Sequence, residues 1–385
     1  MGKKIMLVTG EASGDLHGAN LVRSLQKKDP SLEFCGMGGA ELAAAGVDIL
    51  CDSDKVSVVG IVEVFSQLGE IYKAQKTLRK ELVAAPPDLL ILIDLPDFNL
   101  LLAAKAKKLG IPVYYYICPQ VWAWRSGRIK TLKKRADRFG VILPFEEKYF
   151  KDRGLDATYV GHPLLDSVCR TKTRTQFLTE HNISCATRIV GLLPGSRKRE
   201  VTSLLPVFLE AAVKLQQAVN DKLVFVIPKA SSIDISLFKE AGIERNPAID
   251  VRLIEDDRYN AMAACDCVVA ASGTVTLELA LLNVPMVVTY KLSPITYMLA
   301  KKLVKLDYFS LVNLIAGFEA VPELLQDEVD GQTICNELSI LLNAYPRIKA
   351  MRDALNLVNS KLGGSGASSR SADVVIEMLE NQCGK

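Results

Sequence analysis

Residues 189–197, with the sequence IVGLLPGSR, run from a short apolar segment directly into a loop that contains glycine, serine and arginine. The apolar part, Ile189–Leu193, is typical of a buried strand, and a helical pattern begins at about Val201. Strand, loop and helix in this order form the repeating unit of a parallel sheet, because the helix returns the chain to the same end of the sheet.

The same unit recurs along the whole chain, in two sets. In the second half of the chain, the strands expected after Ile189–Leu193 are Leu223–Ile227, Val251–Ile254, Val268–Ala271 and Pro285–Tyr290. In the first half they are Ile5–Thr9, Glu33–Cys35, Leu89–Ile93 and Val113–Ile117. We therefore expect an α/β fold with two Rossmann-like, doubly wound domains that face each other across a cleft, where such folds bind ligands.

Breaks in the pattern suggest the domain limits. The segment Gly161–Thr175 contains Pro163 and mixed polar residues and is the expected hinge, and Gly363-Gly364-Ser365-Gly366 precedes a last helix near Ser371–Glu380. We expect domains at 1–165 and 166–345, followed by C-terminal helices at 346–385 that pack back on the first domain or exchange with a partner subunit.

Composition narrows the class of protein. The 385 residues are 49% apolar and 24% charged with a net charge of +3, which favours a large core and argues against a chain built to bind nucleic acid. The nine cysteines form no C-x-x-C pair and only three histidines are present, so neither a disulfide framework nor a metal site is expected. No signal peptide and no apolar run of about 18–20 residues is visible, so we expect a cytoplasmic protein, soluble or peripheral.

Two loops in the second half have the composition of a diphosphate site. Gly195, Ser196 and Arg197 combine close backbone approach, hydrogen-bond donors and a permanent charge at the start of a helix. Ser272, Gly273 and Thr274 repeat that geometry, and the carboxylate of Glu278 could accept hydrogen bonds from a ribose. Alternatively, these side chains only cap their helices and complement the helix dipole.

Other nucleotide signatures are missing. Gly36-x-Gly38-Gly39 is followed by Glu41 where a dinucleotide fingerprint needs glycine, and no G-x-x-x-x-G-K-[ST] occurs. The sequence therefore disfavours an NAD enzyme and a Walker-type ATPase.

Carboxylates gather where the strands of the first half end. Pro96 stops the strand Leu89–Ile93 and directs Asp94 toward the carboxyl edge of the sheet, where it could act as a general base. The alternative is that Asp94 or Asp97 caps the next helix. A second polar group at the same edge is Glu11, Ser13, Asp15 and His17.

Apolar and basic stretches suggest a membrane surface. Trp122 and Trp124 precede a run of basic residues to Arg138 with an apolar stripe, and the stretch 56–72, with Val62, Phe65 and Leu68, is apolar on more than one helical face. Residues 297–306 carry lysines opposite apolar residues. These stretches could bind acyl chains or anionic lipid, or else be ordinary core and solvated surface.

Six motifs together resemble the lipid-A-disaccharide synthases nearly end to end and in order. They are Gly10–Asp15, Ile93–Asn99, Pro119–Arg125, Leu193–Arg197, Ala271–Thr274 and Asp307–Asn313. The tryptophan segment and Asp307–Asn313 are the specific ones.

The resemblance implies a GT-B fold and an inverting glycosyltransferase that uses neither metal nor cofactor. The implied donor is UDP-2,3-diacylglucosamine, the acceptor is 2,3-diacylglucosamine 1-phosphate (lipid X), and the products are the β-1,6 disaccharide 1-phosphate of lipid A biosynthesis and UDP. It further implies peripheral attachment to the cytoplasmic face of the inner membrane. By position Asp94 matches the proposed base, Arg197 the diphosphate-binding arginine and Glu278 the ribose-contacting acid, while Asn313 and Gln326 fall at the donor site.

Two other functions fit the same layout. A UDP-sugar 2-epimerase would convert its substrate without an acceptor, and a non-enzymatic UDP-sugar-binding scaffold at the membrane would bind without turnover.

Overall fold

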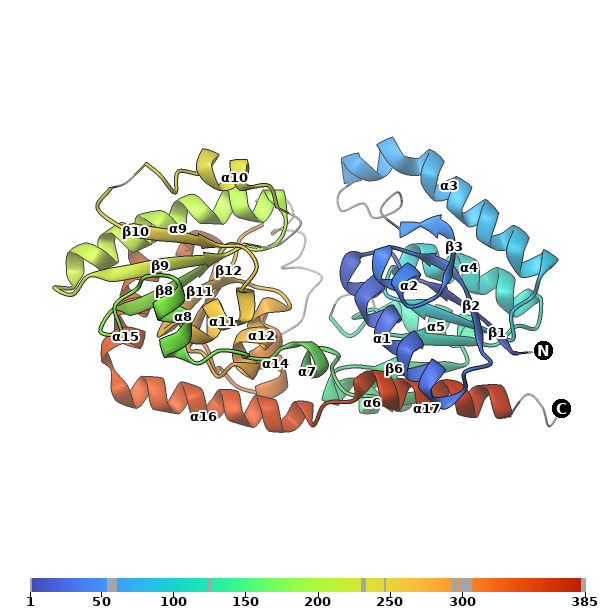
Figure 1. Cartoon of the computed structure of the whole chain (residues 1–385). Helices are drawn as coiled ribbons and strands as arrows, with labels where there is room; N and C mark the ends of the chain where they lie inside the picture. The colour runs from blue at the N-terminus through green and yellow to red at the C-terminus, as the bar shows by residue number, and fades with distance from the viewer. Residues whose placement is uncertain are drawn as a thin grey trace. The chain divides into compact units, whose positions relative to one another are not determined.

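The structure is a computed structural model. It describes residues 2–53, 61–123, 126–229, 233–245, 247–292, 297 and 307–381, and it leaves out the side chains of residues 12, 61–67 and 126. The chain divides into two compact units, Met1–Leu165 together with Gly364–Lys385, and Asp166–Gly363. Each unit is built on one parallel sheet (Figure 1).

The first unit contains a seven-stranded sheet in the order β3-β2-β1-β4-β5-β6-β7. Its strands are β1 Lys4–Val8, β2 Glu33–Gly38, β3 Asp48–Asp52, β4 Leu89–Ile93, β5 Val113–Tyr116, β6 Arg138–Val141 and β7 Ala157–Tyr159. Its helices of five or more residues are α1 Ala12–Lys28, α2 Ala40–Ala44, α3 Ile61–Ala84, α4 Pro96–Lys108, α5 Ile129–Arg135, α6 Pro144–Lys151 and α17 Ala367–Glu380.

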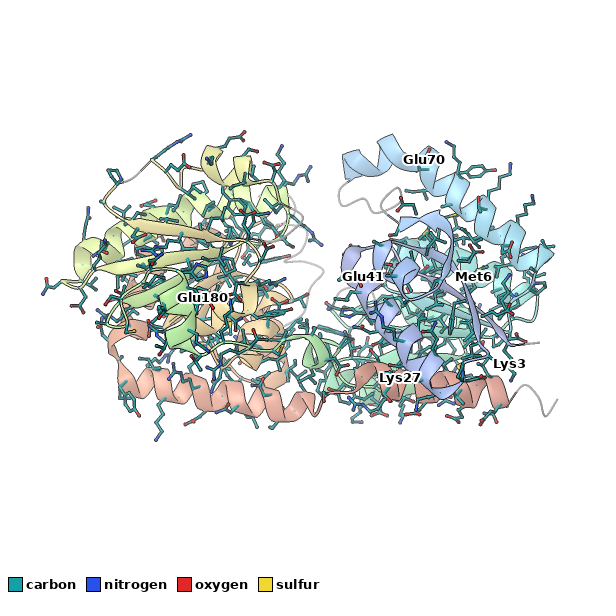
Figure 2. The ribbon with its side chains drawn as sticks, viewed as in Figure 1. Lys3, Met6, Lys27, Glu41, Glu70 and Glu180 are labelled. Atoms are coloured by element: carbon teal, nitrogen blue, oxygen red, sulfur yellow. The ribbon has the colours of Figure 1, made fainter. Side chains whose placement is uncertain are left out.

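The central strands of this sheet are apolar throughout because helices cover both faces. Alternate residues of β4 and β5 feed two separate cores: Leu90, Leu92 and Tyr115 enter one, and Leu89 and Tyr114 enter the other. Figure 2 shows Met6 of β1 inside this unit, where it is fully buried, and Lys27 and Glu41 at its surface.

The second unit repeats the winding with six strands in the order β10-β9-β8-β11-β12-β13. Its strands are β8 Arg188–Leu193, β9 Leu223–Pro228, β10 Asp250–Ile254, β11 Cys267–Ala271, β12 Met286–Tyr290 and β13 Glu323–Leu325. Its helices of five or more residues are α8 Arg174–Glu180, α9 Lys198–Ala218, α10 Ile235–Glu240, α11 Arg258–Ala264, α12 Val275–Leu281, α14 Leu311–Ala316, α15 Gly331–Asn343 and α16 Tyr345–Leu362. The prediction of two doubly wound parallel sheets is confirmed.

The two C-terminal helices belong to different units. Helix α16 packs on α12 and α14 of the second unit, whereas α17 packs along α1 of the first. The hydroxyls of Tyr114 and Ser371 lie 2.9 Å apart in the buried contact between β5 and α17.

The run of basic residues that ends at Arg138 divides between two elements. Helix α5 ends at Arg135, and Arg138 begins β6, where its guanidinium contacts Glu377 of α17 at 3.2 Å and Asp156 at 3.1 Å. Arg138 is therefore paired within the first unit and does not extend the basic surface of α5. None of the helices in the described ranges is both long enough and apolar enough to cross a bilayer.

Candidate active site

In both units the residues predicted to carry chemistry follow two adjacent central strands. Strands β1 and β4 are neighbours in the first sheet, and β8 and β11 are neighbours in the second. In each sheet the winding reverses direction between these two strands, which is where doubly wound folds bind ligands. The residues after β1 and β4 therefore form one candidate site, and those after β8 and β11 another.

On the first unit, Asp94 follows β4 in an unusual backbone conformation. Its φ angle is +49° and that of Leu95 is +43°, both in the left-handed region. The Asp94 side chain is half-buried, and its backbone carbonyl accepts hydrogen bonds from Tyr115 Oη and Asn99 Nδ2, both at 2.7 Å. Helix α4 begins at Pro96, and its N-cap residue is Leu95, with no side-chain cap hydrogen bond.

The Gly10 loop lies beside this turn. A Cβ atom at Gly10 would stand 2.5 Å from Leu95 Cδ2, so any other residue at position 10 would displace the Leu95 side chain. Glu11 precedes α1 as its half-buried N-cap residue, and Ser13 is exposed.

Asp15 is engaged within the fold. It is 4% exposed, and its two carboxylate oxygens accept hydrogen bonds from the Gly39 N–H at 2.7 Å and the Glu41 N–H at 2.9 Å. This carboxylate holds the start of α2 and the end of β2 against α1, so the structure gives Asp15 a role in shaping the loops at this edge of the sheet.

His17 is half-buried and acts electrostatically on a second histidine, His162, for which the sequence predicted no role. His162 is 4% exposed, and burial, with a smaller effect of His17, lowers its pKa to about 3. Its Nδ1 accepts a hydrogen bond from the Leu164 N–H at 3.2 Å, so it is a neutral structural group at neutral pH.

Of the two tryptophans, Trp122 lies in the described part of the chain and Trp124 outside it. Trp122 Nε1 donates to Glu146 Oε1 at 2.9 Å, and its ring packs edge-on against Phe145. Glu146 is buried, which raises its pKa to about 6. The indole is thereby fixed near the carboxyl end of β5.

On the second unit, the loop after β8 is closed by its own helix. Glu200 Oε2 accepts from the Ser196 N–H at 3.0 Å and the Arg197 N–H at 3.3 Å, and Glu200 Oε1 lies 3.6 Å from Arg197 Nη1. Gly195 has φ +109°, and a Cβ there would stand 2.1 Å from Glu200 Oε2. Glu200 therefore occupies the groups predicted to bind a diphosphate, while the Arg197 side chain stays 55% exposed.

The loop after β11 is more open. Gly273 and Thr274 are exposed, and a Cβ at Gly273 would meet no atom within 4 Å. Ser272 is half-buried, and its Oγ donates to the Phe309 carbonyl at 3.4 Å. Space for a ligand against the backbone thus exists at Gly273.

Glu278 lies one turn into α12 and is 5% exposed. Its Oε2 accepts a hydrogen bond from Arg258 Nη2, and burial raises its pKa. Arg258 could not be predicted from the sequence, because no local pattern joins α11 to α12.

Asn313 and Gln326 bind backbone within the second unit. Asn313 is fully buried; its Oδ1 accepts from the Ala320 and Val321 N–H groups, and its Nδ2 donates to the Val321 carbonyl and to Glu323 Oε1. All its hydrogen-bonding groups are used, so it shapes the loop instead of offering its side chain to a ligand. Gln326, at φ +51°, makes two hydrogen bonds to the backbone of Leu292.

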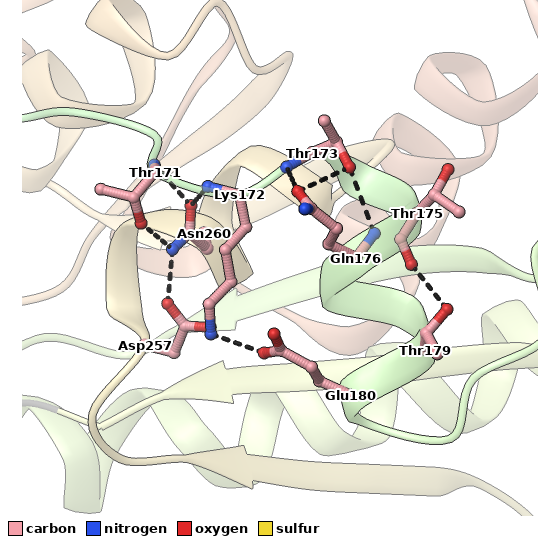
Figure 3. A network of polar contacts seen from close by, with 9 residues as sticks. All are labelled: Thr171, Lys172, Thr173, Thr175, Gln176, Thr179, Glu180, Asp257 and Asn260. Atoms are coloured by element: carbon pink, nitrogen blue, oxygen red, sulfur yellow. Dashed lines mark hydrogen bonds and ion pairs between the residues drawn. The ribbon is translucent and has the colours of Figure 1, made fainter.

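One group in the described ranges has acidic and histidine side chains close enough for a cation: Glu180, His181 and Asp257. Figure 3 shows that the ammonium of Lys172 already joins two of them, with Nζ 2.5 Å from Glu180 and 2.8 Å from Asp257. Asn260 fixes the same segment through the backbone of Thr171 and Lys172. The network anchors the start of the second unit and gives no reason to place a metal there.

Comparison with known proteins decides the family. The family described as Lipid-A-disaccharide synthetase matches residues 5–374. A lipid-A-disaccharide synthase of Geobacter sulfurreducens is 46% identical over 382 residues, which is 98% of each chain. The chain belongs to the lipid-A-disaccharide synthase family. It is therefore a glycosyltransferase of the hexosyltransferase class, with a place in lipid A biosynthesis.

Solved structures confirm the GT-B fold of this lipid-A-disaccharide synthase family member. The calicheamicin glycosyltransferase CalG4 aligns with a TM-score of 0.61 at 14% identity over 98% of each chain. A UDP-GlcNAc 2-epimerase from Neisseria meningitidis, bound to UDP-GlcNAc, aligns with a TM-score of 0.64 at 13% identity, covering 98% of this chain and all of the other. At these identities only the fold is shared, so family membership favours the synthase over the epimerase and the non-enzymatic scaffold.

Proposed function

We propose that this member of the family condenses UDP-2,3-diacylglucosamine with 2,3-diacylglucosamine 1-phosphate to give the β-1,6-linked disaccharide 1-phosphate and UDP. The observation that carries the proposal is the family match over residues 5–374, combined with a polar site after the central strands of each sheet. The first unit supplies the acceptor side, 1–165, and the second the UDP-sugar side, 166–345, with the helices at 346–385 completing both. The cleft expected between them stays a prediction.

The chemistry assigned to the chain is a single displacement. The acceptor's 6-hydroxyl oxygen bonds to the anomeric carbon of the donor while the bond from that carbon to UDP breaks, which inverts the configuration. Asp94 takes the hydroxyl proton as general base. Arg197 and the amides of the loops after β8 and β11 stabilise the charge that develops on the leaving diphosphate.

The donor-side roles divide into direct and supporting ones. Gly195, Ser196, Gly273 and Thr274 approach the diphosphate, and Glu278 accepts from the ribose while Arg258 balances its charge. Ser272, Asn313 and Gln326 hold the surrounding loops. On the acceptor side we assign contacts to Glu11, Ser13 and His17, while Asp15 shapes the loop.

The test is a transfer assay with both diacylated substrates, following UDP and the disaccharide. We expect turnover by the wild type and loss of most activity in Asp94→Asn and Arg197→Ala, each with a native circular dichroism spectrum. Asp152→Asn at the C-cap of α6 and Arg245→Ala on an exposed turn are matched controls that keep activity. Normal turnover by Asp94→Asn would remove the aspartate from the mechanism.

The two lipid substrates also favour peripheral attachment to the cytoplasmic face of the inner membrane, at an anionic surface. Leu68 and Tyr72 of α3 are 49% and 71% exposed, and the neighbouring side chains of Val62 and Phe65 lie outside the described residues. The lysines of α5 supply positive charge. A homodimer is the remaining expectation, and sedimentation velocity decides it.

A further inference from the structure

The turn between β4 and α4 holds two successive residues in a conformation that their side chains disfavour. Asp94 has φ +49°, and Leu95 has φ +43° and ψ +58°. In the left-handed region Cβ crowds the carbonyl oxygen, so non-glycine residues stay there only when their surroundings enforce it. Leucine, unlike asparagine, has no polar side chain to compensate locally.

Two fully buried side chains enforce the turn from one point, the Asp94 carbonyl oxygen. Tyr115 Oη and Asn99 Nδ2 each donate to it at 2.7 Å, and Asn99 Nδ2 also reaches the Ile93 carbonyl at 3.2 Å. A relaxed turn would rotate this carbonyl away and leave two buried donors without that acceptor. Because buried donors are costly to leave unpaired, the clamp opposes relaxation.

The strained turn also determines the contact between Leu95 and the Gly10 loop. In the left-handed conformation the Leu95 side chain lies on Gly10, with no room for a Cβ there. The Asp94 turn and the Gly10 loop are therefore fitted to each other across β4 and β1.

From these contacts we infer that Tyr115 and Asn99 are positioning residues for Asp94, which they hold at the reacting end of the sheet by clamping its carbonyl oxygen. The inference rests on the proposed function, in which Asp94 is the general base. Neither side chain touches a substrate, because both are fully buried behind the turn. They affect the reaction rate because they set the direction in which the Asp94 side chain points from the backbone.

The chain provides a matched control in the adjacent residue. Tyr114 is equally buried, and its hydroxyl bonds Ser371 on the opposite face of the sheet. Tyr115→Phe and Tyr114→Phe thus remove the same buried hydroxyl from neighbouring positions, but only the first removes one of the two side-chain hydrogen bonds to the Asp94 carbonyl.

The experiment measures kcat, both KM values and UDP affinity for these two variants and the wild type. We expect Tyr115→Phe to lower kcat by about tenfold to a hundredfold, with KM and UDP affinity within twofold of wild type. Tyr114→Phe should stay within threefold in kcat. In Tyr115→Phe the acid limb of the pH–rate profile should also move, which a loss of stability alone would not cause. Equal kcat values for the two variants would overturn the inference.

A second pair of variants tests the turn itself and removes the contact of Leu95 with the core in both cases. Leu95 is half-buried, so Leu95→Asn and Leu95→Val both lose its packing, but only asparagine tolerates the left-handed region. We expect Leu95→Asn to keep kcat within threefold and Leu95→Val to lose at least tenfold. Equal loss in both overturns the inference even if Tyr115→Phe does not fold. A wild type without transferase activity would instead refute the proposed function, and the inference with it.

Discussion

Glu200 should compete with the donor for the loop after β8. Its carboxylate binds the Ser196 and Arg197 amides at 3.0 and 3.3 Å and lies 3.6 Å from the Arg197 guanidinium, which are the groups we assign to the diphosphate. Binding of UDP must break these contacts before it can form its own. Glu200→Gln keeps an oxygen for the amides but removes the attraction to Arg197 and the repulsion of phosphate.

The solvent exposure of Arg197 and Glu200 determines how strongly their ion pair can compete with UDP. Arg197 is 55% and Glu200 32% exposed, and an ion pair of this kind contributes about 1 kcal/mol or less. Removal of a competitor worth about 1 kcal/mol tightens binding about fivefold. Isothermal titration with UDP should therefore give a Kd about fivefold lower for Glu200→Gln than for the wild type.

The control is Glu210→Gln in the same helix, where Glu210 lies 3.8 Å from Lys214, far along α9 from the loop. It makes the same change of charge and should leave the UDP affinity unchanged. A weaker affinity in Glu200→Gln would refute the reasoning, because Glu200 would then be shaping the loop for the donor and not competing with it.

Three further changes test other parts of the molecule. Burial lowers the pKa of His162 from 6.5 to about 3, so the unfolded chain binds a proton that the folded chain does not, and stability falls as the pH drops below 6.5, by about 2 kcal/mol at pH 5. His162→Asn, whose Oδ1 can accept from Leu164, should lose less in urea unfolding between pH 7.5 and pH 5, and equal losses would exclude His162 as the cause. Asn313→Ala leaves buried backbone groups unpaired and should lower the free energy of unfolding by about 2–4 kcal/mol, against a small effect of the exposed Asn343→Ala. Leu68→Glu should reduce pelleting with anionic liposomes several-fold, whereas Val83→Glu at the far end of α3 should not; unchanged pelleting in Leu68→Glu would place the membrane contact elsewhere.

The buried strands could be predicted from the sequence because a strand with helices on both faces of its sheet is a continuous apolar run. Leu89–Ile93 was predicted with its observed bounds. Four strands were missed. Strands β3, β7 and β13 lie at the edge of a sheet, whereas β6 lies inside the first sheet and begins at Arg138, the last residue of the basic run. Edge strands are short and carry polar residues, as in Asp48–Asp52, so they lack the apolar run that identifies a central strand.

For the candidate sites, the sequence predicted the loops that carry the site residues, but not the side chains that contact those residues. Asp94, Arg197 and Ser272 could be located because each lies in the loop that follows an apolar strand. Their partners come from other elements: Tyr115 lies on the neighbouring strand, and Arg258 on another helix. Even Glu200, three residues from Arg197, looked like an ordinary residue of the first helical turn. Such contacts depend on three-dimensional packing, which no local pattern records.

The first unit is made of two separate parts of the chain, residues 1–165 and 364–385, and this affects how it forms during biosynthesis. Helix α17 buries Ala372, Val375 and Leu379 against the core that also contains Leu21 of α1 and Ile91 of β4. During translation the part of this core that α17 covers stays exposed until that helix leaves the ribosome, whereas residues 166–363 are already complete. The nascent N-terminal half must therefore wait with an exposed apolar surface, which is where a chaperone would be expected to bind.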